Sequence, residues 1–311
     1  MARAGPKVAV SLSTAKADKM SSVPSRAFWT DPELSKFAPL PRIIAFDQFS
    51  RGFRGYTALV GNYEHTLDNV LPGFRDMSQP MLSNGTHWDT GSHGGHDGTY
   101  ALKIQTRPRA RSINMALKRF TFRKACPIQI ETYFAMKPEA TELKLSASDA
   151  GSFGLVLDLH DNERRVMPHI RYVNALDGER VEKWQFKRFV ETPADVGGEH
   201  SLGETRSHHH FGPEGWEDIP DGHQQLCYNE VATKYNWHYL KLGFDLQSMT
   251  FTSLQCNDRV FDVSALEPML MPPWPNLNCL FNVCWTAEAA TDKRTFVYLD
   301  SVLVSGDWED A

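Results

Sequence analysis

The sequence has few cysteines for its length and no long apolar run. A membrane-spanning helix needs roughly 18 consecutive apolar residues, and no segment of the 311-residue chain reaches that length. The five cysteines show no C-x-x-C pair and no framework spacing, which favours free, mostly buried thiols in a reducing compartment. The N-terminal region lacks the apolar core of a secretory signal. We therefore expect a cytoplasmic location and no membrane partner.

Motifs of several large enzyme classes are also missing. The sequence has no G-x-S-x-G, no G-x-x-x-x-G-K-[ST] and no strand-placed G-x-G-x-x-G, so it implies no organic cofactor. A net charge of −5 gives no support to nucleic-acid binding. Aromatic residues are plentiful, with 18 Phe, 9 Tyr and 8 Trp. They suit packed sheets and also surfaces on which sugars stack.

Alternating apolar and polar residues predict an antiparallel β-protein. The clearest part is the meander 152–186, where Leu155, Leu157 and Leu159 fall on one face and Asp158 falls on the other. The dipeptide Asp177-Gly178 closes one of its hairpins. Further strands are predicted over these segments: 42–49, 99–106, 112–122, 127–136, 236–245, 250–257, 278–286 and 294–304.

The strand pattern predicts one domain with a preceding arm. Residues 1–41 form the arm, with a short helix beginning at Asp31 and a proline at its first position. Residues 42–311 form the domain. Two long stretches without a clear strand pattern, near 62–98 and 189–230, are expected to be cover loops.

Three short motifs carry a resemblance to a known superfamily. They are F-D-Q-F at 46–49, D-G-T-Y-A-L-K-I at 97–104 and Y-L-D-S-V-L-V at 298–304. They resemble the marks of concanavalin A-like lectins and glucanases, and some carbohydrate-binding modules share them. The likeness covers about residues 42–305 and implies an all-β, antiparallel jelly-roll sandwich with few short helices. In a jelly roll the first and last strands lie side by side.

The resemblance also implies a structural calcium ion near Asp47 and Asp300. Carboxylate and carbonyl oxygens are the ligands that calcium prefers. The alternative is that Asp47 caps a turn and Asp300 pairs with a neighbouring cation. If a calcium binds only the folded state, chelation lowers the melting temperature.

Two histidine-containing loops are further ligand candidates. The first carries His87, Asp89, His93, His96 and Asp97. These residue types suit zinc, but their spacing matches no known zinc motif, so a solvated or substrate-lining loop is the alternative. The second contains the run 208–210, in which His209 is expected to face solvent or substrate rather than a closed metal site.

The polar face of the meander supplies candidate catalytic residues: Asp158, His160, His169, Arg171, Tyr172 and Glu182. Asp158 with Glu182, or with Glu131, would form a carboxylate pair for glycoside cleavage. His169 or His160 with Tyr172 would instead serve as base and acid in β-elimination from a uronic acid, with an arginine stabilising the anion. Ordinary solvated sheet faces also carry such charges.

The resemblance implies that a sugar lies across this face. The expected substrate-binding residues are Trp88, His93, His96, Arg164, Lys183, Trp184, His209, Trp216 and Trp285. The tryptophans and Tyr172 would stack on the sugar, although core packing is the alternative for each, and for Trp237 it is favoured. Arg164, Lys183 and neighbouring arginines would present positive charge to an anionic sugar.

We therefore predict a carbohydrate-active enzyme, a glycosidase or sugar lyase acting on a small or anionic glycoside. The alternative is a non-catalytic, lectin-like carbohydrate-binding module. The E-x-D-x-x-E motif of jelly-roll glucanases is missing, as is the R-x-E-x-R, Q-[IV]-H and Y-x-K-x-G-x-Y set of alginate lyases. His160, His169, Arg171 and Tyr172 are expected in one pocket. Self-association is left open.

Overall fold

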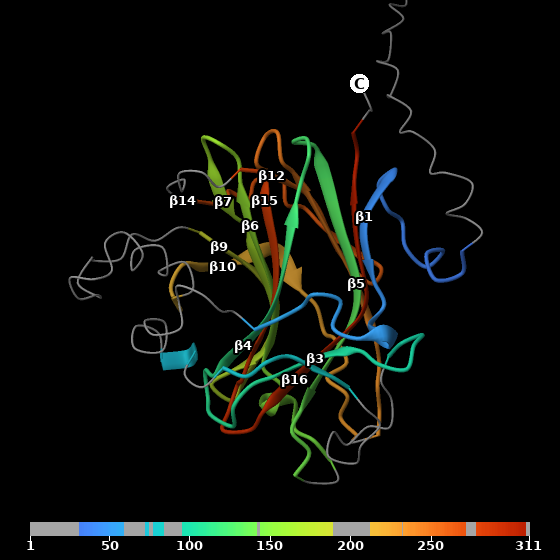
Figure 1. Cartoon of the computed structure of the whole chain (residues 1–311). Coiled ribbons are helices and arrows are strands. Elements are labelled where there is room, and N and C mark those ends of the chain that lie inside the picture. Colours follow the sequence, from blue (N-terminus) through green and yellow to red (C-terminus); the bar gives the residue numbers. More distant parts are fainter. Residues whose placement is uncertain are drawn as a thin grey trace, which may run out of the picture.

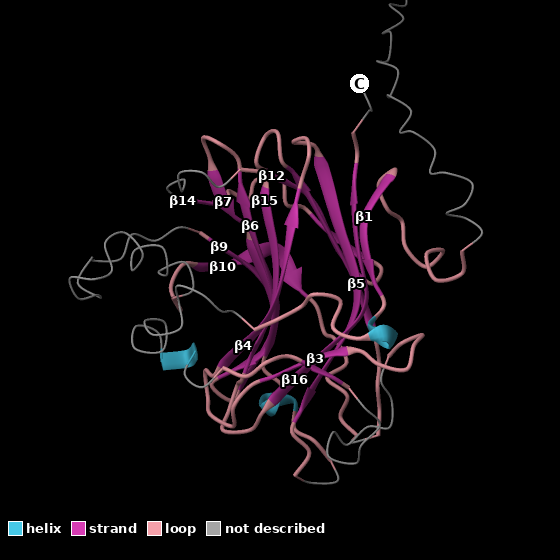
Figure 2. Ribbon diagram, in the orientation of Figure 1, coloured by secondary structure: helices cyan, strands magenta, loops and turns pink. Residues whose placement is uncertain are grey.

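Two antiparallel sheets make up most of the described chain (Figures 1 and 2). The computed structural model describes residues 31–58, 72–74, 77–83, 95–141, 144–188, 212–231, 233–271 and 278–308. Helical turns in these ranges are short 3-10 segments: η2 (Phe49–Arg51), η3 (Pro72–Phe74) and η5 (Ala147–Asp149). Within the same ranges, no helix is long and apolar enough to cross a bilayer.

Sheet A contains the first and the last of the described strands. Its strands are β1 (Arg42–Asp47), β2 (Met81–Leu82), β3 (Leu102–Gln105), β5 (Pro127–Pro138), β11 (His238–Asp245), β12 (Thr250–Cys256), β13 (Arg259–Phe261) and β16 (Thr295–Gly306). The order is β13-β12-β11-β5-β16-β3-β2, and β1 also pairs with β16. Phe46 on β1 lies opposite Leu303 on β16. The predicted adjacency of the first and last strands is confirmed.

Sheet B is built around the central meander. Its strands are β4 (Ile113–Thr121), β6 (Ser152–His160), β7 (Arg165–Met167), β8 (His169–Leu176), β9 (Glu179–Lys187), β10 (Trp216–His223), β14 (Met269–Met271) and β15 (Leu280–Glu288). The order is β10-β9-β8-β6-β15-β4, with β7 paired to both β6 and β14. Figure 1 shows β6, β7, β9 and β10 of sheet B on the left and β1 and β5 of sheet A on the right. The all-β jelly-roll sandwich predicted from the sequence is confirmed.

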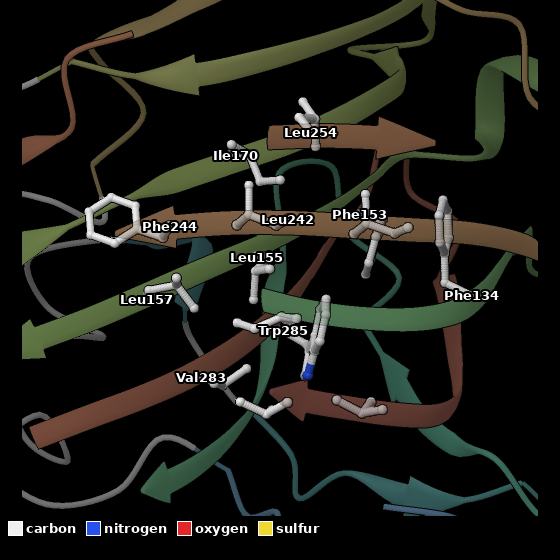
Figure 3. Packing of buried hydrophobic residues seen from close by; sticks show 14 of the residues in the cluster. Phe134, Phe153, Leu155, Leu157, Ile170, Leu242, Phe244, Leu254, Val283 and Trp285 are labelled. Carbon is white, nitrogen blue, oxygen red and sulfur yellow. The ribbon is translucent and has the colours of Figure 1, made fainter. Parts of the chain in front are cut away.

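The core lies between the inner faces of the two sheets. Leu155 and Leu157 of sheet B are fully buried in one cluster with Leu242 of sheet A (Figure 3). Phe134 of β5 stacks on Phe153 of β6, with 4.2 Å between ring centroids. Because side chains alternate along a strand, burying these residues turns their neighbours toward the outer face of sheet B. That outer face carries the candidate site.

Local signals explain where the meander turns. Asp177 and Gly178 both have positive φ, 51° and 78°, as a tight hairpin turn requires. Within the predicted meander, the chain after the first turn forms two strands, β7 and β8, because Pro168 between them has no N–H for the ladder. The helix predicted at Asp31 is instead a turn, in which the carbonyl of Asp31 accepts hydrogen bonds from Leu34 and Ser35.

Strand β10 falls in the stretch where the sequence predicted only a loop. It forms one edge of sheet B and pairs with β9. Its sequence, W-E-D-I-P-D-G-H, includes three carboxylates and Pro220. The pairing shifts register between Asp218 and His223. Such residues are typical of edge strands, because an edge does not need every backbone N–H.

Candidate functional site

A cavity of about 420 Å³ opens on the outer face of sheet B. This volume lies within the range of about 300–1,000 Å³ that small-molecule sites occupy. Its apolar wall includes Phe74, Ile113, Met115, Val156 and the half-buried Trp216. Its polar lining includes Arg111, His169, Arg171, Lys187, Thr286 and Glu288.

Cross-strand register brings these residues together from distant parts of the sequence. One row of directly paired positions runs across the sheet: Met115, Thr286, Gly154, Arg171, Gln185 and Asp218. Residues paired in this way share a face of the sheet. Gly154 keeps the middle of the row free of a side chain, since a Cβ there would lie 2.5 Å from Oγ1 of Thr286. Arg171 and Thr286 can therefore both line the cavity.

Arg171 is held from three sides. Its Nε donates to Oε1 of Gln185 at 2.9 Å, and its Nη1 donates to Oε2 of Glu288 at 2.9 Å. The guanidinium lies over the ring of Trp216, 4.1 Å from the centroid. Burial lowers the pKa of Arg171 to about 10, and Glu288 opposes that shift. The side chain is thus a positive, fixed donor in the cavity wall.

Glu288 joins two arginines. Its Oε1 accepts from Nη1 of Arg111 at 3.3 Å, and its Oε2 also accepts from the Ser152 hydroxyl at 3.3 Å. Arg111 makes two further hydrogen bonds to the carboxylate of Asp177, at 2.8 and 2.6 Å. This network fixes the carboxylate of Glu288 at the cavity.

Lys187 and His169 are both buried in the cavity lining. Lys187 donates a hydrogen bond to the Gly212 carbonyl, and its ammonium lies 5.3 Å from the ring centroid of Trp216. Burial and the nearby Arg171 lower the pKa of Lys187 to about 7. Burial, Lys187 and Arg171 lower the pKa of His169 well below its usual value, so its imidazole is neutral at pH 7.

The cavity brings together three of the residues predicted from the sequence: His169, Arg171 and Trp216. The His169 and Trp216 rings meet edge to face, 6.1 Å apart. His160 is buried near the far end of β6, where its Nδ1 contacts the carbonyl of Asp161, and it is not part of the cavity lining.

Three predicted aromatic residues lie in the core and do not line the cavity: Tyr172, Trp184 and Trp285. The Tyr172 hydroxyl donates to the carbonyl of Gln224 at 2.8 Å, and Nε1 of Trp184 donates to the Gln224 side chain at 2.9 Å. Trp285 stacks on Phe153. Strand alternation points these rings to the inner face, so they are unavailable to a ligand in the cavity.

Each of the three predicted carboxylates has a partner of its own, and none of them lines the cavity. Asp158 accepts two hydrogen bonds from Arg165, at 2.9 and 3.1 Å. Glu182 pairs with Arg180. Glu131 is on sheet A, where it accepts from the Tyr239 hydroxyl at 2.5 Å.

Two of the predicted cationic contacts lie in exposed ion pairs. Arg164 binds Asp161 and Lys183 binds Asp218.

His96 is on the sheet A side, stacked on Tyr133 at 4.5 Å. The remaining predicted ligand residues lie outside the described residues: His87, Trp88, Asp89, His93 and His208–His210.

The two aspartates expected to hold calcium do not fit a calcium site. Lys118 donates to both oxygens of Asp47, at 2.7 and 2.6 Å. Asp300 accepts the backbone N–H groups of His96 and Asp97, at 2.6 and 3.0 Å. In the described part of the chain, no three His, Cys, Asp or Glu residues are grouped as metal ligands. Both oxygens of Asp47 and Oδ2 of Asp300 thus already accept N–H groups, and Oδ1 of Asp300 accepts the hydroxyl of Ser301 at 3.2 Å.

A protein-family model matches residues 25–308, which is most of the chain. The chain belongs to this family. Its description is "Domain of unknown function (DUF6772)". No curated protein matches the chain in sequence.

Several solved structures are similar to the chain. The carbohydrate recognition domain of Emp47p gives a TM-score of 0.41 at 5% identity, covering 88% of this chain and 100% of that one. A legume lectin-like domain from Entamoeba histolytica gives 0.37 at 9% identity, covering 69% and 89%. A lectin from Bauhinia forficata in complex with GalNAc gives 0.33 at 7% identity, covering 68% and 90%. The jelly-roll assignment itself follows from the strand pairing described above.

Sequence reasoning missed three charged residues of the cavity: Arg111, Lys187 and Glu288. The signal for Lys187 was present, because Trp184 and Phe186 alternate with it and are buried in the core. The sequence held no comparable signal for Arg111 in its turn, or for Glu288 at the end of β15. Their proximity depends on the turn and on strand register.

Proposed function

We propose that this protein binds a carbohydrate in the cavity on the outer face of sheet B, without transforming it. The observation that carries the proposal is one cavity that combines the half-buried indole of Trp216, with the guanidinium of Arg171 over its ring, and the fixed carboxylate of Glu288. Sugars present apolar C–H faces and hydroxyl groups close together. A site with one aromatic surface and a few fixed polar groups matches that chemistry.

The charged residues favour binding over glycoside cleavage. Hydrolysis by the common mechanisms needs two carboxyl groups about 5–9.5 Å apart across the bond. Among the described residues, Glu288 is the one carboxylate that lines the cavity, and two arginines hold it. Elimination with Tyr172 as the acid is also disfavoured, because that hydroxyl is buried against Gln224. We therefore favour a lectin-like role over a glycosidase or lyase.

Replacing Trp216 with alanine tests the proposal. A glycan array first identifies sugars that bind, and titration calorimetry then compares the variants. We expect Trp216→Ala to weaken binding more than about tenfold, or about 1.4 kcal/mol, because the aromatic surface is lost.

Trp237→Ala is the matched control, since Trp237 makes its ring contacts with Tyr235 and His96 on the sheet A side. It should bind as the native protein does. Equal binding by Trp216→Ala and the native protein would contradict the proposal, as would turnover of the bound glycoside.

A further inference from the structure

Lys187 is the one buried cation of the cavity that forms no ion pair with a carboxylate among the described residues. Of the three cations in the cavity, Arg111 is paired with Asp177 and Arg171 with Glu288. No carboxylate among the described residues lies within 4 Å of the Lys187 amine, which donates to the Gly212 carbonyl. The residue is 3% exposed. Burying an ammonium without a counter-ion costs several kcal/mol, so the protonated amine is unfavourable here, in line with its lowered pKa.

The position of Lys187 gives that charge access to a ligand. Trp184 and Phe186 of β9 point into the core, which turns Lys187 to the outer face. Lys187 lies directly opposite Trp216 on β10, and both line the cavity. A sugar in this cavity therefore has its substituents within reach of the Lys187 amine.

We infer that the ligand is a carboxylated sugar and that its carboxylate pairs with Lys187 inside the cavity. The inference rests on the proposed carbohydrate binding and names the class of sugar. A carboxylate supplies one negative charge, which matches the one cation without a described partner. A phosphate dianion would add a second charge beside Glu288, where like charges repel.

Proton uptake should accompany this binding. Around Lys187 are His169 and Arg171 from β8, Glu288 from β15, and Glu214 before β10, which is exposed and screened by water. In the free protein Lys187 titrates at about 7. A bound carboxylate favours the ammonium, so it raises this pKa. Above pH 7, affinity should fall by up to about tenfold per pH unit, because the amine must first take up a proton.

Titration calorimetry on the full chain tests the inference with methyl glucuronoside, methyl galacturonoside and N-acetylneuraminic acid, against methyl glucoside and methyl galactoside. Titrations at pH 6 in MES and in Bis-Tris, and at pH 8.5 in TAPS and in Tris, give the number of protons taken up. We expect at least one carboxylated sugar to bind more than about tenfold more tightly than the neutral sugars at pH 6. At pH 8.5 it should take up most of one proton.

Lys187→Met is the diagnostic variant and Lys183→Met its matched control. Lys183 is on the same strand and the same face, but it forms an exposed pair with Asp218. Lys187→Met should lose both the preference and the proton uptake while melting no lower than the native protein, because it removes an unfavourable buried charge. Lys183→Met should keep both.

The outcomes separate this inference from the proposed function. Equal binding of carboxylated and neutral sugars without proton uptake overturns the inference and leaves carbohydrate binding intact. A preference that survives in Lys187→Met, or a stronger preference for a glucose phosphate probe, also overturns it. Failure of every sugar to bind overturns both.

Discussion

Replacing Lys118 with methionine is expected to lower the free energy of unfolding by about 3 kcal/mol at pH 7, because it leaves a buried carboxylate without its main counter-charge. Asp47 is 1% exposed and accepts hydrogen bonds from Lys118 at both oxygens. The other cation nearby, Arg54, is 3.7 Å away and exposed. Urea unfolding of the variant and the native protein measures the difference.

The loss of stability in Lys118→Met should be larger at neutral pH than at acid pH. Burial raises the pKa of Asp47, and Lys118 opposes that shift. Without Lys118 the folded-state pKa rises further, so the folded variant binds a proton more readily than the unfolded chain. The difference in unfolding free energy between the native protein and Lys118→Met should therefore be complete above the pKa of Asp47 in the folded variant. It should shrink as the pH falls and be smallest below about pH 4.

A double variant and a chelator supply the controls. Asp47→Asn with Lys118→Met removes both charges and should recover part of the loss. Excess EDTA should leave the melting temperature unchanged, in contrast to the prediction from sequence, because Lys118 already neutralises Asp47. A fall in melting temperature with EDTA would show that a metal ion does bind the folded protein.

Glu288→Gln is expected to cost about 3 kcal/mol of stability and to abolish carbohydrate binding, since the buried Arg171 then has no carboxylate partner. Glu288 is the carboxylate that Arg171 contacts, and it also accepts from Arg111 and Ser152. Losing it frees the cavity wall to rearrange. Urea unfolding and glycan binding by calorimetry measure the two effects.

The control for this variant is Glu217→Gln. Glu217 forms an ion pair with Arg188 at 3.1 Å, and both side chains are about half exposed. Such a surface pair contributes about 0–1 kcal/mol, so this variant should unfold and bind almost as the native protein does. If Glu288→Gln matched this control in stability, the network would not hold the cavity together.

The alternation of side chains along a strand explains why the fold was largely predictable. It also explains why Tyr172 does not line the cavity. The period of two that buries Leu155 and Leu157 correctly predicted the meander. The same period places His169 and Arg171 on the outer face of β8. Tyr172, the next residue of the strand, must therefore point to the inner face and into the core. Grouping Tyr172 with the two outer residues ignored this constraint.

Register and edge chemistry account for the rest. Glu288 reaches Arg171 only because β15 pairs with β6 and β6 with β8 in one alignment, and a slip of one residue would turn it away. Strand β10 was missed because Pro220 and its acidic residues are depleted in strands. Its strand conformation depends on pairing with β9, a long-range contact that local sequence does not encode.

The composition of β10 also bears on how copies of the molecule meet one another. An open sheet edge exposes N–H and C=O groups that invite another chain to add a strand and start an aggregate. A second molecule approaching β10 edge to edge would meet Pro220, which has no N–H to offer, and the charged side chains of Asp221 and of the ion pairs Glu217–Arg188 and Asp218–Lys183. Edge-to-edge polymerisation through β10 is therefore disfavoured.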